Sequence, residues 1–400
     1  MASWFTHHGD RPGAGFPSGA GAGASGGVER NRYLDLLRVL AISGVVYGHW
    51  LLINLRYSGG RFSNLDTLDY VAWGRDITWA FQVMPVFFLA GGYANALSWT
   101  AHRAQGERWN WWIQRRAMRL WWPTAAYLGV NAAAIATAGG AGGGAANVAV
   151  VGQLVTRQLW FLPVYLVMIA LTPVMLAAQR RWGLAVPVGL AAAAALVSAA
   201  AAVPHLAVLG YANYLLVWGS IHQWGFAWHD GMLTRTRRRP RALAAAGAAL
   251  LVGLVASGVF PADMIGPGNT SPPSIALLAY AAALAGLVVA AEPAAARLLA
   301  GSRRWHRVRS LNGTVMTVNL WHFAPVLVIA AAFYPAGMMP QPGRLVPAHG
   351  GRIRAGRPSA LAGCAAGLAA TLLSGRGPAP GASQPQALSP RQPRQPPKAA

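Results

Sequence analysis

The chain has 400 residues, 54% of them hydrophobic and only 11% charged, and its formal net charge is +23. Charged residues make up about a quarter of an average soluble protein, so the composition excludes an ordinary cytosolic enzyme. The single Cys excludes a disulfide framework and a cysteine-based zinc site.

The first segment, residues 1–29, consists mainly of Gly, Ala, Ser and Pro. Such a composition cannot bury a hydrophobic core, so we expect a disordered cytoplasmic tail. The segment lacks the apolar centre of a signal peptide, and we do not expect it to be cleaved as one.

Nine apolar stretches follow between residues 30 and 335, each long enough to cross a bilayer, which takes roughly 17–25 residues. Because backbone groups in lipid need internal hydrogen bonds, we expect these stretches to be helices. The predicted fold class is an all-α polytopic membrane protein, a bundle of nine to ten transmembrane helices. The predicted spans are 36–55, 77–98, 120–138, 158–178, 184–203, 207–228, 242–260, 275–291 and 313–335.

The distribution of positive charge predicts the orientation of this bundle. With the N-terminus in the cytoplasm, the cytoplasmic segments contain twenty Lys and Arg residues and the outer loops contain four. Positive residues collect in cytoplasmic loops, so we predict a cytoplasmic N-terminus. Because the charge is confined to short runs between apolar stretches, we expect no nucleic-acid partner despite the basic net charge.

The last segment, residues 336–400, is a low-complexity tail rich in Pro, Arg and Ala, without aromatic or acidic residues from position 341 onward. Its longest apolar run, from Leu361 to Leu373, is too short to span a bilayer comfortably. We hypothesise that the tail is the frameshifted remnant of a tenth helix. A genuine disordered tail is the alternative.

Arg38 and His49 are the first candidates for chemistry, because charged and titratable groups within a membrane are costly. They are 11 residues apart, or three helical turns plus about 20°, so they share one face with an axial separation of about 16 Å. Arg38 would lie at the cytoplasmic mouth of a groove, with His49 deep within it as a general base. Alternatively, Arg38 anchors the helix end and His49 makes an interhelical hydrogen bond.

A second cluster of Arg residues precedes the predicted span 120–138. Arg116 and Arg119 are three residues apart and share a helix face, and Arg115 lies beside them. Arg suits bidentate binding of phosphate, so the cluster can hold a phosphorylated substrate. The alternative is a basic anchor at the membrane surface beside an aromatic belt.

Five short motifs, in the right order, resemble those of the acyltransferase 3 family of integral membrane O-acyltransferases. Arg38 and His49 match the family's pattern of Arg, ten residues and His in the first helix. Arg116 and Arg119 match its Arg-x-x-Arg pattern. The other matching stretches are 84–93, 159–162 and 319–322. The excess of Arg over Lys is typical of a GC-rich bacterial genome, so the chain resembles an actinobacterial-type member.

The resemblance implies a membrane acyltransferase domain over residues 30–335, with acyl-CoA as co-substrate, no permanently bound cofactor and no metal. Arg115, Arg116 and Arg119 would bind the phosphates of acyl-CoA. Arg38 would orient this donor, and His49 would take the proton from an acceptor hydroxyl. We expect an acetyl group to be moved to a cell-envelope carbohydrate, a glycolipid or a secondary metabolite, in the lipid bilayer of the bacterial plasma membrane.

Three further residues are candidates for supporting roles. Asp35 is placed to orient Arg38 through an i, i+3 ion pair. His322 is a candidate for binding the acceptor or a water molecule, and a structural hydrogen bond between helices is the alternative. Trp160 is a candidate for contacting the acceptor, and an anchor at the membrane interface is the alternative.

Two other functions stay open at this stage. A transporter or flippase would also have nine or ten helices with few buried charges, although the two halves show no convincing internal repeat. A catalytically inactive family member is the other alternative, because membership does not guarantee activity. Substrate-dependent release of free CoA distinguishes the enzyme from both.

Overall fold

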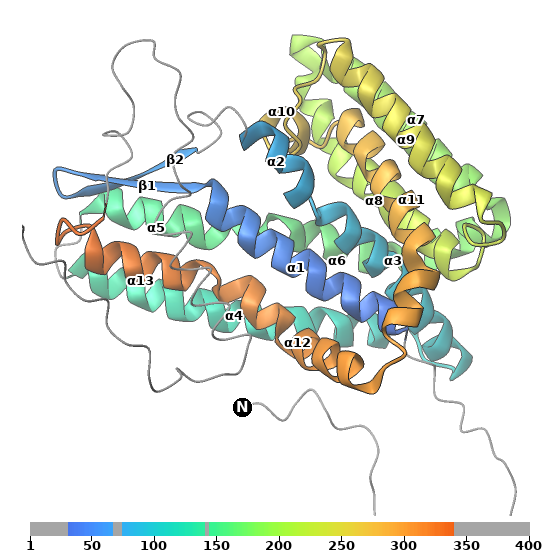
Figure 1. The fold of residues 1–400 in the computed structure, drawn as a ribbon, viewed down its shortest axis with the longest axis horizontal. Coiled ribbons are helices and arrows are strands. Elements are labelled where there is room, and N and C mark those ends of the chain that lie inside the picture. Colours follow the sequence, from blue (N-terminus) through green and yellow to red (C-terminus); the bar gives the residue numbers. More distant parts are fainter. Residues whose placement is uncertain (1–30, 67–73, 141–143, 340–400) are drawn as a thin grey trace, which may run out of the picture.

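The computed structural model describes residues 31–66, 74–140 and 144–339, and these form a bundle of helices with one β-hairpin (Figure 1). The predicted all-α class is confirmed. The predicted tails lie outside the described residues, apart from positions 336–339.

The elements are as follows in chain order. The first half contains α1 (Arg32–Leu52), β1 (Ile53–Ser58), β2 (Arg61–Asp66), α2 (Gly74–Phe81), α3 (Met84–Ala104), α4 (Trp109–Gly140), α5 (Ala145–Arg157) and α6 (Phe161–Trp182). The second half contains α7 (Ala185–Ala201), α8 (Asn213–His229), α9 (Arg238–Ala256), α10 (Pro267–Thr270), α11 (Ile275–Leu298), α12 (Ser302–Trp321) and α13 (Phe323–Phe333). Short 3₁₀ segments, Gln158–Trp160 and Pro204–Ala212, precede α6 and α8.

All nine predicted spans overlap helices, but fewer helices meet the requirements for crossing a bilayer. Among the described residues, five helices are long and apolar enough, or six if the bent pair α12 and α13 forms one span. The predicted count of nine to ten spans and the cytoplasmic N-terminus are therefore not confirmed. The difference arises because sequence reading treats each apolar run as one straight helix. In the structure α7 has only 17 residues, and the helices of spans 207–228 and 313–335 are interrupted.

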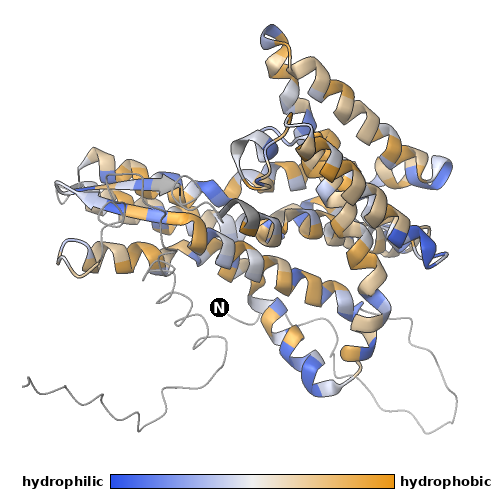
Figure 2. Cartoon of the chain, turned by 45° about the horizontal axis from the view of Figure 1, so that its top comes forward, coloured by the Kyte–Doolittle hydropathy of each residue, from blue (hydrophilic) through white to orange (hydrophobic). Residues whose placement is uncertain are grey.

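The surface of the bundle has the hydropathy pattern of a protein in lipid. Hydrophobic residues run along the long helices, and hydrophilic residues gather at helix ends and along the first half of α12 (Figure 2). Large apolar side chains face outward on α7, where Leu196 is 73% exposed and Val188 is 65% exposed. Exposed apolar surface of this kind is suited to contact with acyl chains.

A β-hairpin follows α1, where the sequence predicted the end of the span 36–55 and the connection to the span 77–98. Gly59 and Gly60 form its turn with φ angles of 57° and 77°, and positive φ at both central residues is what a two-residue type I′ hairpin turn requires. The side chain of Asn147 in α5 accepts a hydrogen bond from the backbone N–H of Phe62 at 2.7 Å and donates one to the carbonyl of Gly60 at 3.1 Å. The connection between the predicted spans 120–138 and 158–178 thus contains a helix, α5, that holds the hairpin.

The centre of the bundle depends on a close crossing of α3 and α8. A Cβ on Gly92 would overlap the backbone carbonyl of His222, and one on Gly225 would overlap the carbonyl of Leu89. Small residues allow helix backbones to approach closely within a membrane. The crossing fixes the position of α3 within the core.

Replacing Gly225 with alanine should lower the free energy of unfolding by about 1–3 kcal/mol, because the backbone of α3 must move to admit the methyl group. Gly253→Ala in α9 is the matched control, since no heavy atom lies within 4 Å of its added Cβ and alanine is the better helix former. Thermal unfolding of both variants in detergent measures the effect. Equal melting temperatures for the two would contradict the prediction.

Candidate functional site

His49, near the C-terminal end of α1, and His322, between α12 and α13, form a hydrogen-bonded pair. Nδ1 of His49 lies 2.9 Å from Nε2 of His322. Their ring planes differ by 13° and the ring centroids are 5.1 Å apart, so the nitrogen edges of the two rings face each other. The ring of Phe323 packs against both, with centroid distances of 5.2 Å to His49 and 4.1 Å to His322. Two residues predicted separately as site residues are thus in direct contact.

The pair exists because the predicted last span is bent at His322. The axes of α12 and α13 differ by 46°. Pro325 has no backbone N–H, and in a straight helix its ring would collide with the carbonyl of Trp321, four residues earlier. A helix therefore breaks or bends just before this proline, which is the position of His322.

The bend frees backbone carbonyls, and side chains pair with them. Within a membrane such groups need partners from the protein itself. Nε2 of Gln158 donates to the carbonyl of Leu320 at 2.7 Å, and Nε1 of Trp50 donates to the carbonyl of His322 at 2.8 Å. The ring of His322 bonds the carbonyl of Asn319 through Nδ1 at 2.7 Å. These three bonds hold the bent backbone and the imidazole of His322 in one arrangement.

The partners of His322 determine which nitrogen of His49 is free. A carbonyl oxygen only accepts, so Nδ1 of His322 carries a proton in its bond to Asn319. In a neutral His322, Nε2 is then an acceptor, and His49 donates to it through Nδ1. Nε2 of His49 is therefore unprotonated, and its lone pair can accept a proton.

A cavity of about 340 Å³ lies beside the pair, with His49 in its wall. This size falls in the range of about 300–1,000 Å³ for small-molecule sites. Aromatic rings make up much of the wall, and the polar residues in it include Arg157, Gln158 and Asn319. His49 is only half-buried because the cavity reaches it. A substrate in the cavity can therefore contact its imidazole.

Arg38 lies in α1, eleven residues before His49, with 34% of its side chain exposed. Its Nη1 is 3.5 Å from Oδ1 of Asp35, so the structure contains the ion pair that the spacing predicted. Asp35 is buried and also accepts a hydrogen bond from Nδ2 of Asn312 in α12 at 3.0 Å. The carboxylate thus links the guanidinium of Arg38 to a second helix.

The Arg residues of α4 differ in their surroundings. Arg116 is half-buried, donates to the carbonyl of Ala94 at 3.2 Å and stacks over the ring of Trp112 at 5.0 Å. Arg38 of α1 and Arg119 of α4 are both close enough to Arg116 to act on it electrostatically, and we call these three residues the basic cluster.

Arg115 is turned to a different partner. It is exposed and donates to the carboxylate of Glu107, and this hydrogen bond lowers the pKa of Glu107 below its ordinary value. Arg115 therefore already has a counter-ion, whereas among the described residues no carboxylate forms an ion pair with Arg116 or Arg119.

Trp160 ends the 3₁₀ segment before α6 and forms part of the cavity wall. It is 39% exposed, and its ring lies 5.7 Å from that of Trp218 and 6.2 Å from that of Tyr214. This position allows contact with a ligand in the cavity as well as with the surroundings of the bundle.

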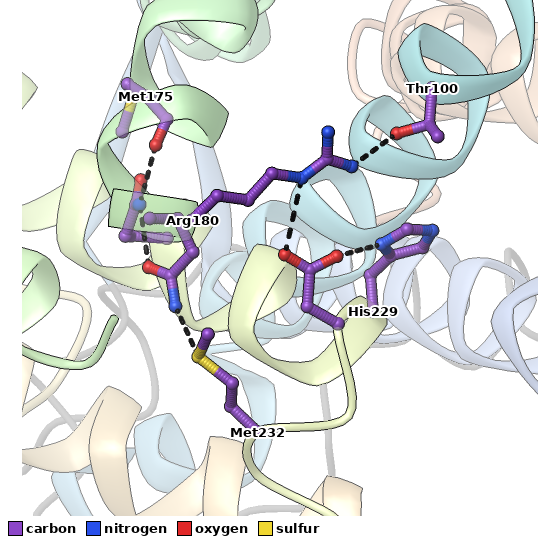
Figure 3. A network of polar contacts seen from close by, with 8 residues as sticks. Thr100, Met175, Arg180, His229 and Met232 are labelled. Atoms are coloured by element: carbon purple, nitrogen blue, oxygen red, sulfur yellow. Dashed lines mark hydrogen bonds and ion pairs between the residues drawn. The ribbon is translucent and has the colours of Figure 1, made fainter. Parts of the chain in front are cut away.

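A separate polar network ties together α3, α6 and the end of α8 (Figure 3). Arg180 reaches from α6 to Thr100 of α3 at 3.0 Å, and its Nε lies 3.9 Å from Oδ2 of Asp230. Asp230 also bonds Nδ1 of His229 at 2.8 Å. The network contains none of the predicted site residues, and the contacts of Arg180 within it join different helices.

Sequence reading missed two residues at the site, Gln158 and Asn319, although the matched motifs begin at or beside them. Both are 3% exposed, and both line the cavity. Two features of the sequence could have indicated these residues. One is a carboxamide side chain at the start of the predicted span 158–178, and the other is Pro325, which lies just after His322. Among the described residues, no group of three or more His, Cys, Asp or Glu side chains could hold a metal ion.

Comparison with known proteins gives one match. A family model described as an acyltransferase domain, Acyl_transf_3, matches residues 31–376. The match covers the described helices and continues through the apolar run that ends at Leu373. No curated protein and no solved structure shows a significant match.

Proposed function

Because the chain belongs to the acyltransferase 3 family, and is thus a multi-pass membrane protein, we propose that it moves an acyl group, in the first instance acetyl, from cytoplasmic acyl-CoA to a hydroxyl. The proposed acceptor is a cell-envelope carbohydrate, a glycolipid or a secondary metabolite at the bacterial plasma membrane. The observation that carries this proposal is the pairing of His322 with His49, which lies in the wall of a ligand-sized cavity.

The two ends of α1 lie in different surroundings, one suited to the acyl-CoA donor and the other to the acceptor. Its N-terminal half carries Arg38, which acts electrostatically on Arg116 of α4. Its C-terminal half lines the cavity. Along a helix, Arg38 and His49 are separated by about 16 Å. A donor with phosphates at the basic cluster and a thioester near His49 would meet an acceptor held in the cavity.

In the proposed reaction Nε2 of His49 takes the proton of the acceptor hydroxyl as its oxygen attacks the thioester carbon. The C–O bond forms and the carbonyl electrons move to the carbonyl oxygen. When the carbonyl is restored, the C–S bond breaks and the CoA sulfur leaves with the proton held by His49. The products are an ester and CoA, and His322 keeps the imidazole of His49 in the required tautomer throughout.

The test is CoA release by membranes that contain the full chain, with acetyl-CoA and a crude envelope extract as the source of acceptor. We expect release that requires the extract and produces an acetylated product. Release that is independent of any acceptor, or none from well-expressed protein, would contradict the proposal.

A transporter or flippase is the second candidate, and the bent span α12–α13 is the observation that favours it. Interrupted helices often line the substrate sites of transporters. Movement of a substrate across the membrane without CoA release would support that function in place of acyl transfer.

Replacing Arg119 with alanine should raise the KM for acetyl-CoA about tenfold or more, because a hydrogen bond to a charged group contributes about 1.5–3 kcal/mol. Arg119 is exposed, so the bundle should fold without it. Arg181→Ala, at the exposed end of α6, removes the same charge away from the basic cluster and serves as the control. Equal KM values for the two variants would show that Arg119 does not bind acetyl-CoA.

A further inference from the structure

The side chain of Asn319 has a buried amide nitrogen with no visible use in the fold. Asn319 is 3% exposed, and its Nδ2 has no hydrogen-bond partner among the described residues. Buried polar groups in native proteins are almost always paired, so an unpaired one calls for an explanation. The residue lines the same cavity as His49.

The backbone of Asn319 is tied to the histidine pair. Its carbonyl accepts the hydrogen bond from Nδ1 of His322, and His322 in turn bonds His49. The carbonyl of the next residue, Leu320, is held by Gln158. The amide of Asn319 is therefore carried on a segment whose position is fixed relative to the base.

The carboxamide donors of the two glutamines in the cavity wall are already engaged. Nε2 of Gln158 bonds Leu320, and Nε2 of Gln82 bonds the carbonyl of Met264 at 2.6 Å. The unpaired atom of Gln158 is Oε1, an acceptor, which cannot stabilise negative charge. Arg157 and the indole N–H of Trp160 are the rival donors, but both residues are exposed. A charge in contact with solvent, such as that of Arg157, is screened.

From these contacts we infer that Asn319 is a catalytic residue whose Nδ2 donates a hydrogen bond to the carbonyl oxygen of the acyl thioester. The inference rests on the proposed acyl transfer. When the acceptor oxygen bonds to the thioester carbon, the carbonyl electron pair moves onto this oxygen, and the N–H stabilises the charge. A hydrogen-bond donor that is already in position where charge develops lowers the barrier at this point. The bond weakens again when the C–S bond breaks and CoA leaves.

The direct test is the infrared carbonyl band of acetyl-CoA labelled with carbon-13 at the carbonyl, bound to the solubilised full chain without acceptor. A hydrogen bond to the carbonyl oxygen shifts this band to lower frequency. We expect a shift in the wild type that is lost in Asn319→Ala and in the isosteric Asn319→Asp. Asn131→Ala is the matched control, because Asn131 donates only within its own helix, to the carbonyl of Tyr127.

Turnover gives an independent readout. With acceptor present, Asn319→Ala should lower kcat by about 10²–10³-fold and leave the KM for acetyl-CoA nearly unchanged. The substitution does not touch the backbone carbonyl that holds His322, so the histidine pair should persist.

The outcomes separate the inference from the proposed function. A band shift without turnover would support Asn319 and refute acyl transfer by this chain. Turnover without a band shift would support the proposed acyl transfer but would overturn the role of Asn319 as the donor to the thioester carbonyl. A shift that survives in both Asn319 variants but disappears in Arg157→Gln would also overturn it and assign the donor to Arg157.

Discussion

Replacing His49 with alanine should lower acceptor-dependent CoA release by about 10²–10⁴-fold, the usual cost of removing a general base. The reason is specific to one atom. Nδ1 of His49 is committed to His322, so Nε2 carries the lone pair that can take the proton of the acceptor. Without it the attacking hydroxyl must lose its proton to water. The measurement is the initial rate of CoA release at saturating acetyl-CoA.

The control for this variant is His205→Ala, which removes an exposed imidazole from the 3₁₀ segment before α8. Both variants should reach the membrane in equal amounts, and only His49→Ala should lose activity. If His49→Ala retains a rate near that of the wild type, another group takes the proton and the assignment is wrong.

Replacing His322 with alanine should lower kcat by roughly 10²-fold or more while the KM for acetyl-CoA stays nearly the same. His322 does not have to contact the donor; it fixes the tautomer of His49 through a 2.9 Å hydrogen bond. Loss of the partner that orients a catalytic imidazole costs about 10⁴-fold in the Ser-His-Asp triad, where the wrong tautomer results. The effect should therefore appear in kcat.

His322→Gln distinguishes orientation from proton transfer. The carboxamide oxygen of glutamine can accept the proton of Nδ1 of His49, but it cannot pass a proton onward as an imidazole does. If His322 only orients His49, the glutamine variant should recover part of the activity lost in the alanine variant. Equal, large losses in both would instead indicate that His322 itself carries a proton.

Much of the architecture could be predicted from the sequence, because apolar runs of bilayer length have few alternatives to helices. Every predicted span overlaps a helix. The number of spans could not be predicted, since it depends on where helices bend. Pro325 accounts for the bend at His322, and its effect depends on whether other side chains pair with the freed carbonyls. That condition involves α1 and the segment before α6, which are distant in sequence.

Of the candidate site, only contacts between residues of the same helix could be predicted from the sequence. Arg38 and Asp35 are one turn apart, so their ion pair follows from helix periodicity. His49 and His322 are 273 positions apart in the sequence, and helix periodicity cannot predict a contact between residues so far apart in the chain. The same limit applies to Arg115. Its sequence position suggested phosphate binding, but the fold gives it Glu107 as a counter-ion.

The bend at His322 also determines how the protein can be stabilised. Proline inside a helix is less favourable than alanine by about 3 kcal/mol, so Pro325 is an obvious position to change when greater heat resistance is sought. In a straightened helix the carbonyls of Asn319 and His322 would accept regular backbone hydrogen bonds in place of their side-chain partners. His322 would then no longer be held in contact with His49. Selection for thermal tolerance at this position would therefore act against turnover, as in other proteins whose function depends on a locally unfavourable backbone.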